Sequence, residues 1–126
     1  MVGIVVVSHS HNLAESVVEY TKIMADGAHT AAAGGLEDGS FGTSFDKIYQ
    51  AVDSVYSEDG VILIMDLGSA VMTAEMVIEA YGKDNVQMAD CPVLEGAVVA
   101  TIDALCGMAL DEILEALNEV GRTAKF

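Results

Sequence analysis

The fold of this chain is decided by its opening stretch, Gly3-Ile4-Val5-Val6-Val7-Ser8-His9-Ser10-His11. The apolar run is too short for a helix and rich in Val and Ile, which favours a strand buried on both faces of a parallel sheet. Small and polar residues then end the run, and helical spacing begins near Asn12. His9 is therefore expected at the carboxyl end of a central strand, the edge at which open α/β sheets place their chemistry.

The rest of the chain alternates between predicted strands and helices. Strand-like runs at 28–33, 61–65 and 85–90 are separated by helical patterns at 12–25, 44–56 and 70–81, and two further helices are expected at 94–105 and 111–120. This order predicts an α/β fold with an open parallel sheet of four strands, a possible extra edge strand, and helices on both faces. No linker or internal repeat interrupts the pattern, so residues 1–126 are expected to form a single domain.

Apolar spacing also predicts which side chains reach the core. Asn12 is the expected N-cap of the first helix, because Glu15 follows it by three residues. The inward stripe of that helix is expected to be Leu13, Val17, Tyr20, Ile23 and Met24. Met72 and Met76 are also expected in the core. The two cysteines, Cys91 and Cys106, match neither a disulfide framework nor a zinc spacing, so reduced core residues and a cytoplasmic location are expected.

The charge of the chain limits its partners. Twenty acidic residues stand against five basic ones, a net charge of -15 over 126 residues. Such a surface disfavours nucleic acid and anionic membranes, both of which require basic side chains. It would attract protein partners that carry basic patches, although it is equally consistent with acid residues that only keep an apolar domain soluble. No apolar stretch reaches the roughly 18 residues that a membrane-spanning helix needs.

Three predicted strand ends bring chemistry-bearing residues to one edge of the sheet. The first strand brings His9, whose neutral imidazole is a nucleophile at neutral pH. The third brings Asp66, a carboxylate suited to orient the ring and stabilise developing positive charge. A helix start and a glycine-rich loop at 34–44 offer donors to an anion. The predicted phosphate-binding residues are Ser10, Gly39, Gly42, Thr43, Gly68 and Ser69, and no metal ligand set is expected.

Each of these features also has a simpler interpretation. A histidine after a strand is commonly a polar loop residue, Asp66 to Ser69 is compatible with a turn and helix cap, and a glycine-rich loop is compatible with a plain surface loop. Their joint presence at one edge favours a functional site. His11 competes with His9 for the reactive role, whereas His29 is expected at the opposite end of the second strand, in a structural or surface position.

Four motifs together resemble a known family. They are Val6-Val7-Ser8-His9-Ser10, the loop from Gly39 to Ser44, Met65-Asp66-Leu67-Gly68-Ser69-Ala70, and Pro92-Val93-Leu94-Glu95-Gly96. In this order and spacing they resemble the DhaM phosphotransferase subunits of phosphoenolpyruvate-dependent dihydroxyacetone kinases, relatives of the mannose-type IIA domains of the sugar phosphotransferase system. The resemblance covers the whole chain.

The resemblance implies a phosphotransferase that works through a phosphohistidine. His9 would accept phosphate from the phosphocarrier protein HPr and pass it to ADP held in the nucleotide subunit of the kinase, so that this chain needs no cofactor of its own. Asp66 would be the partner of the active histidine, and Ser69 a hydroxyl near the phosphate. The loop from Gly39 to Thr43 would flank the site. A homodimer is implied, and a chain that ends at Phe126 resembles the single-domain members that rely on a separate HPr.

Three alternatives remain open at the level of the sequence. A small cobalt- or iron-chelatase also places a histidine after its first strand but needs a second histidine ligand across the cleft. A receiver-like signalling module would use Asp66 as phosphoacceptor but needs an acidic cluster after the first strand to hold magnesium. A non-catalytic interaction module predicts no covalent phosphate. The residues do not indicate which imidazole nitrogen reacts, where two copies would meet, or whether dihydroxyacetone is the final acceptor.

Overall fold

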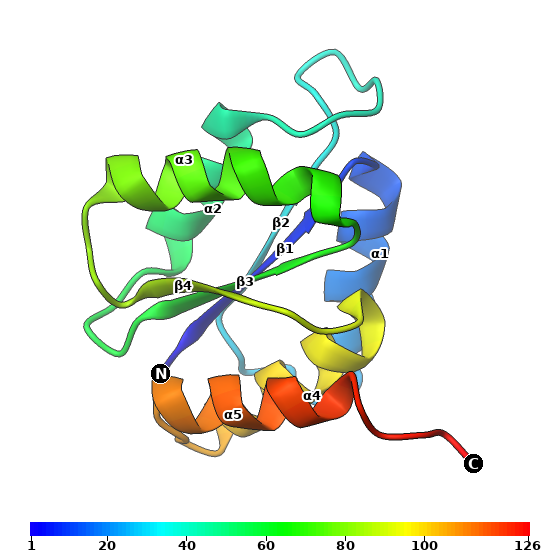
Figure 1. Ribbon diagram of the computed structural model, residues 1–126, viewed down its shortest axis with the longest axis vertical. Helices are drawn as coiled ribbons and strands as arrows, with labels where there is room; N and C mark the ends of the chain where they lie inside the picture. Colours follow the sequence, from blue (N-terminus) through cyan, green and yellow to red (C-terminus); the bar gives the residue numbers. More distant parts are fainter.

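The computed structural model describes residues 1–126 and contains one parallel sheet with the strand order β2-β1-β3-β4 (Figure 1). The strands are β1 (Gly3–Ser8), β2 (Thr30–Gly34), β3 (Val61–Met65) and β4 (Val86–Ala89). The predicted α/β sheet of four parallel strands is thereby confirmed, and the extra edge strand is absent. All residues of β1 are buried, because the strand is central and both of its faces are covered.

Five α-helices and one 3₁₀ turn surround the sheet. They are α1 (His11–Thr21), α2 (Phe45–Val55), the turn η1 (Gly68–Ala70), α3 (Val71–Tyr81), α4 (Val93–Leu105) and α5 (Leu110–Val120). Helices α2 and α3 cover one face, and α1, α4 and α5 cover the other (Figure 1). Along β1, Ile4 and Val6 join the core on the α1 side, while Val5 and Val7 join the core on the α2 side. None of the helices is long and apolar enough to cross a bilayer.

The first helix differs most from the expectation. Its N-cap is Ser10, whose hydroxyl accepts a hydrogen bond from the Leu13 amide, and the expected cap Asn12 is a helical residue. The side chains that it buries are Ala14, Val17, Val18 and Thr21. Only Val17 of the expected inward stripe is buried, and Ile23 is 76% exposed. The helix lies so close to the sheet that a Cβ on Gly34 would come within 2.8 Å of the Ala14 Cβ. This spacing admits small side chains only.

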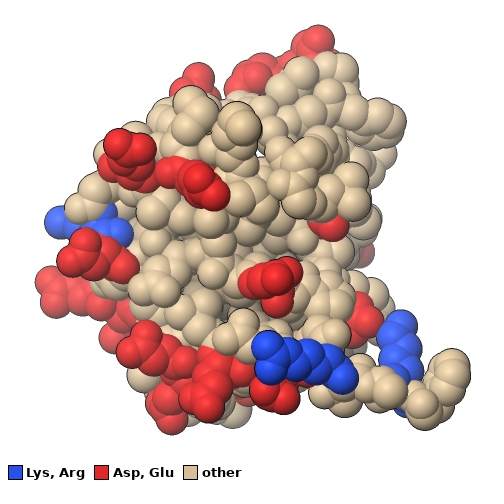
Figure 2. All heavy atoms as spheres, viewed as in Figure 1, with Lys and Arg blue, Asp and Glu red and all other residues tan.

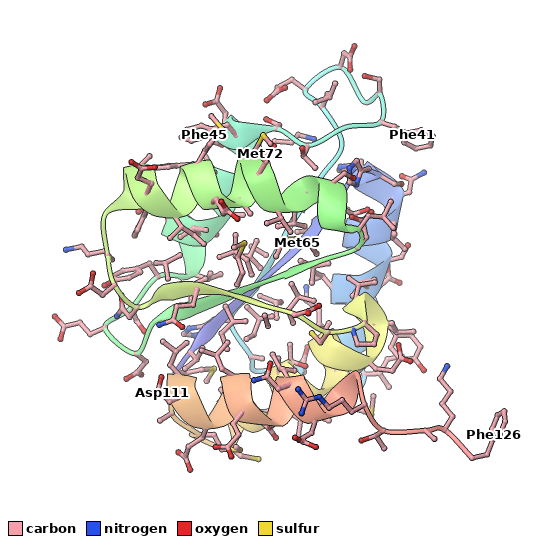
Figure 3. The ribbon with its side chains drawn as sticks, in the orientation of Figure 1. Phe41, Phe45, Met65, Met72, Asp111 and Phe126 are labelled. Carbon is pink, nitrogen blue, oxygen red and sulfur yellow. The ribbon has the colours of Figure 1, made fainter.

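Met72 and Met76, which were also expected in the core, are wrong predictions, since small side chains again face the sheet. Met72 is 75% exposed, and Met76 is also exposed, because α3 and the preceding turn face the sheet with Ala70, Ala74 and Val77. Figure 3 shows Met72 on the side of α3 that faces away from the sheet. Cys106 is exposed at the end of α4, and only Cys91 is partly buried, with both thiols free.

The close contact between β2 and α1 gives a stability prediction. A Cβ added to Gly34 would overlap the carbonyl oxygen of Ser10 and crowd Ala14. Gly34→Ala is therefore expected to lower the free energy of unfolding by about 1–3 kcal/mol, as overpacking generally does. Chemical denaturation measures this. The control is Gly121→Ala, whose nearest neighbour would be the Pro92 Cδ at 3.6 Å and which should leave stability unchanged. Equal stabilities of the two variants would contradict the tight packing.

Candidate functional site

Three strand ends meet at one edge of the sheet, as the sequence predicts. Ser8 pairs with Gly34 at the end of β2, and Val7 pairs with Met65 at the end of β3. The edge lies between the starts of α1 and α3 and the loop that follows β2 (Figure 1). The register therefore brings His9, Asp66 and the glycine-rich loop together from positions far apart in the chain.

His9 is held by hydrogen bonds on both ring nitrogens. Its Nδ1 lies 3.0 Å from Asp66 Oδ1, and its Nε2 lies 2.9 Å from Ser69 Oγ. The side chain is 27% exposed, which leaves the ring accessible to a partner molecule. The imidazole thus has a defined orientation and an open face, the two features that a nucleophile serving a macromolecular partner needs.

Asp66 receives four hydrogen bonds. Oδ2 accepts from the Ser8 hydroxyl at 2.9 Å and the His9 amide at 3.1 Å, while Oδ1 accepts from the His9 ring and from the Leu67 amide at 2.7 Å. Burial by itself would raise the pKa of Asp66, but these hydrogen bonds outweigh it and hold the pKa below its usual value. The group is therefore a carboxylate at neutral pH.

The hydrogen bonds assign the tautomer of His9. A carboxylate can only accept, so the proton of the neutral ring lies on Nδ1 and points at Asp66. Nε2 then carries the lone pair and accepts from the Ser69 hydroxyl. In this arrangement Nε2 is the nitrogen with an available lone pair, and Asp66 is placed where a carboxylate would stabilise positive charge on the ring.

Two helix starts next to His9 present unpaired amides. The amides of His11 and Asn12 at the start of α1, and of Gly68 and Ser69 at the start of η1, donate no hydrogen bond within the chain. Free amides at the N-terminus of a helix are favourable partners for an anion. Ser10 caps α1, since its hydroxyl oxygen accepts from the Leu13 amide, and its O–H donates to no group within the chain.

The glycine-rich loop is tied to the site by its own hydrogen bonds. The Gly42 amide donates to the carbonyl of His9 at 2.9 Å, and the Thr43 hydroxyl lies 3.0 Å from that of Thr73 in α3. The Gly39 amide donates within the loop to the Leu36 carbonyl. The predicted donors Gly39 and Gly42 are thus occupied by the chain itself, because the loop has few other ways to satisfy its backbone. Their position supports a role in shaping the site.

The other two histidines lie outside this network. His11 is the first residue of α1 and is exposed, without a hydrogen bond to Asp66 or Ser69. His29 is exposed and precedes β2, where its carbonyl accepts from the Ile4 amide at the amino end of the sheet. Only the His9 ring forms hydrogen bonds with both Asp66 and Ser69.

Basic side chains do not reach the reactive ring. Lys47 donates to the Gly34 carbonyl at 2.9 Å, Arg122 pairs with Glu119, and Lys125 pairs with Glu95 in the first turn of α4. Figure 2 shows acidic side chains gathered mainly at the left and bottom of the face in view, with basic ones at the left and along the lower right. Burial raises the pKa of Cys91 to about 11, so its thiol stays protonated and does not compete with His9 as a nucleophile.

The sequence predicts that Ser8 ends the first strand but does not indicate a role for its side chain. The structure shows it wholly buried and bonded to Asp66. The sequence signal for this contact is a polar residue at the end of an otherwise apolar strand. A hydroxyl buried there needs hydrogen-bond partners, and these are found among the neighbouring polar residues. The sequence also predicts Gly68 and Ser69 as donors to an anion, and the structure leaves the backbone amides of both without a partner inside the chain.

Comparison with known proteins gives consistent matches. The family model EIIA-man, described as "PTS system fructose IIA component", matches residues 3–118. The phosphoryl donor subunit DhaM of the PEP-dependent dihydroxyacetone kinase of Escherichia coli is 35% identical over 121 residues, 90% of this chain and 26% of that protein. The phosphotransferase subunit DhaM of the PTS-dependent dihydroxyacetone kinase of Lactococcus lactis is 34% identical over 118 residues and 94% of each chain.

The solved structures agree on the fold. A phosphotransferase system component EIIA from Streptococcus agalactiae superposes with a TM-score of 0.72 at 13% identity, covering 97% of this chain and 93% of its own. At that identity the match supports the architecture alone. The chain spans about a quarter of the length of the E. coli relative but nearly all of the L. lactis one.

Proposed function

This chain belongs to the EIIA-man family of phosphotransferase-system components, and we propose on that premise that it is a phosphoryl carrier for a dihydroxyacetone kinase. In this proposal His9 accepts a phosphoryl group from phospho-HPr and passes it to ADP bound in the nucleotide subunit of the kinase. The relatives from E. coli and L. lactis, named as phosphoryl donor and phosphotransferase subunits of such kinases, support it. The observation that carries it is the orientation of His9 between Asp66 and Ser69.

The first transfer follows from this geometry. The lone pair of Nε2 attacks the phosphorus of the donor phosphohistidine, an N–P bond forms on His9, and the N–P bond of the donor breaks. The proton stays on Nδ1, so the ring gains positive charge opposite the Asp66 carboxylate, 3.0 Å away. The Ser69 hydroxyl, which donates to Nε2 beforehand, is then free to donate to a phosphoryl oxygen. Free amides at two helix starts are suited to stabilise the remaining charge.

The second transfer reverses these changes. An oxygen of the β-phosphate of ADP attacks the phosphorus, the N–P bond on His9 breaks, and its electron pair returns to Nε2. ATP and a neutral imidazole result. The nucleotide is proposed to reside in the partner subunit, so this chain needs neither cofactor nor metal. A partner with a basic surface would supply the cations that the site lacks, and the net charge of -15 would accelerate its approach.

The test is a two-stage transfer with purified components in the cytoplasmic system that we propose. The chain is incubated with phosphoenolpyruvate, Enzyme I and HPr, and the ADP-binding kinase subunit is added in the second stage. We expect acid-labile, base-stable phosphate on the chain in the first stage and its loss in the second. Failure to take up phosphate would refute the carrier role. Base-labile phosphate from a small-molecule donor would indicate a receiver-like module instead, and tight metal binding a chelatase.

We also propose that two copies associate through an apolar face formed by α1, the turn after it, and α4. Its exposed residues are Leu13, Tyr20, Ile23, Met24, Leu94 and Leu105. Helices α1 and α4 pack side by side, and Leu105 reaches the turn at Gly27. In a chain with 20 acidic residues, a second copy is best accommodated where exposed apolar side chains gather, because like charges repel.

Ile23→Glu is expected to dissociate this dimer. A carboxylate in the middle of the apolar face would have to be buried without a partner, which should raise the dissociation constant on the order of 100-fold or more. Light scattering after gel filtration measures the mass. Met72→Glu is the matched control, since Met72 is 75% exposed against 76% for Ile23 but lies on α3. A dimer that survives Ile23→Glu, or a monomeric wild type, would rule out this interface.

A further inference from the structure

A serine that the proposed transfer does not yet use lies behind the reactive pair. Ser8 is the last residue of β1 and is completely buried. Its hydroxyl donates to Asp66 Oδ2 at 2.9 Å and accepts from the Ser10 amide at 3.0 Å. The Ser8 hydroxyl therefore forms hydrogen bonds with both the Asp66 carboxylate and the backbone amide of Ser10, the residue that follows His9.

We propose that Ser8 is a positioning residue for phosphoryl transfer, whose hydroxyl holds the Asp66 carboxylate in the orientation that keeps the proton of His9 on Nδ1. The inference rests on the proposed function of His9. Ser8 touches neither the ring nor a phosphoryl group, and acts through Asp66 and through the backbone around His9.

The hydrogen-bond pattern of Asp66 explains why this hydroxyl matters. Two donors, Ser8 and the His9 amide, hold Oδ2, and this leaves Oδ1 directed at Nδ1. Without the Ser8 hydroxyl, Oδ2 keeps only the His9 amide at 3.1 Å, so the carboxylate is held less firmly in the orientation that directs Oδ1 at the ring. The ring then loses the acceptor that distinguishes its two tautomers, and a proton on Nε2 blocks the lone pair that attacks phosphorus.

The hydrogen bond from the Ser10 amide to the Ser8 hydroxyl fixes the backbone on either side of His9. The Ser8 hydroxyl and the Ser10 amide close a short turn around His9, the kind of local bond that serine forms readily. The Gly42 amide holds the carbonyl of His9 from the other side. Loss of the Ser8 hydroxyl leaves the Ser10 amide without its acceptor and loosens the segment that aims the ring.

The experiment compares wild type, Ser8→Ala and Ser8→Thr in the full chain, with Thr21→Val as the control. Thr21 is another buried hydroxyl, 1% exposed, but it bonds to the Val18 carbonyl at the other end of α1. Two experiments are made on each variant. The ¹⁵N NMR shifts of the His9 ring report the tautomer without any partner, and steady-state kinetics give kcat and KM for transfer from phospho-HPr.

For Ser8→Ala we expect kcat to fall about tenfold with KM unchanged, and the His9 ring to become a mixture of tautomers. Ser8→Thr, which keeps a hydroxyl, should restore both, and Thr21→Val should lose stability with neither readout changed. A Ser8→Ala protein with wild-type tautomer and kcat would overturn the proposal, whatever its stability. If wild type takes up no phosphate, the carrier function fails instead, and the NMR result alone then decides the role of Ser8.

Discussion

His9→Gln is expected to abolish phosphoryl uptake from phospho-HPr. Glutamine has a similar reach but no nucleophilic nitrogen, so labelling should fall at least about 10³-fold, to the background of the assay. Folding should be retained, because the ring is partly exposed and fills no part of the core. The measurement is the acid-labile phosphate bound per chain after incubation with phosphoenolpyruvate, Enzyme I and HPr, with the melting temperature recorded in parallel.

His11→Gln is the matched control for this loss. It removes an imidazole two residues away that has no hydrogen bond to Asp66 or Ser69. We expect labelling within about twofold of wild type, since surface substitutions away from a site have small effects. The opposite pattern, with His9→Gln labelled and His11→Gln unlabelled, would transfer the carrier role to His11 and disprove the assignment.

Asp66→Asn is expected to slow phosphoryl transfer on the order of 10²–10⁴-fold, as the loss of the carboxylate in comparable pairs does. An amide has one accepting and one donating end, whereas both oxygens of Asp66 accept. If its NH₂ faces His9, Nδ1 has to accept and the proton moves to Nε2, the nitrogen that attacks. If it takes the place of Oδ2, it opposes the His9 amide, which can only donate. Stopped-flow transfer from phospho-HPr measures the rate.

Asp90→Asn makes the same change of charge next to this site. Asp90 is exposed directly after β4, at the edge that carries Asp66. Its rate should stay near wild type, which separates the specific hydrogen bonds of Asp66 from the general acidity of the surface. The pKa of Asp66 lies below its usual value, so wild type should show no loss of rate from its protonation between about pH 5 and 8. Similar rates for Asp66→Asn and wild type would exclude the tautomer mechanism.

In the proposed function, the phosphoryl group on His9 would be stabilised without a cation from this chain. A lysine or arginine beside His9 would stabilise the phosphorylated state strongly, and a group that is too stable is passed on slowly. Backbone amides and one hydroxyl give a weaker and fixed stabilisation. The proposed partners would then bring positive charge during each transfer and take it away on dissociation.

The position of the candidate site at this edge could be predicted because its parts have strong local signals. A short Val- and Ile-rich run has few structural options, and its abrupt end at Ser8 and His9 marks the edge of the sheet. The same logic located Asp66 after β3, whose predicted bounds agree with the structure. Right-handed crossovers then require parallel strands whose ends coincide, and so His9 and Asp66 are brought together by topology alone.

The inward face of α1 could not be predicted in this way. The spacing of apolar residues predicts that one face of the helix is apolar and the other polar. The apolar face with Tyr20, Ile23 and Met24 is nevertheless mostly exposed. The helix approaches the sheet closely at Gly34 and presents Ala14 there. Distance between elements is a property of the packed chain, and a periodic pattern cannot distinguish a face that covers the sheet from a face that awaits another surface.

By itself, therefore, the sequence determined the alternation of strands and helices, the edge at which the candidate site lies, and that His9 and Asp66 meet there, because periodicity and chain topology depend on local order. The tertiary structure decided which nitrogen of His9 carries the proton, that Ser8 holds Asp66 from behind, and which amides stay free. These features depend on hydrogen bonds between strand ends, formed with a precision of tenths of an ångström. Only the folded chain supplies that precision, since it fixes both partners at once.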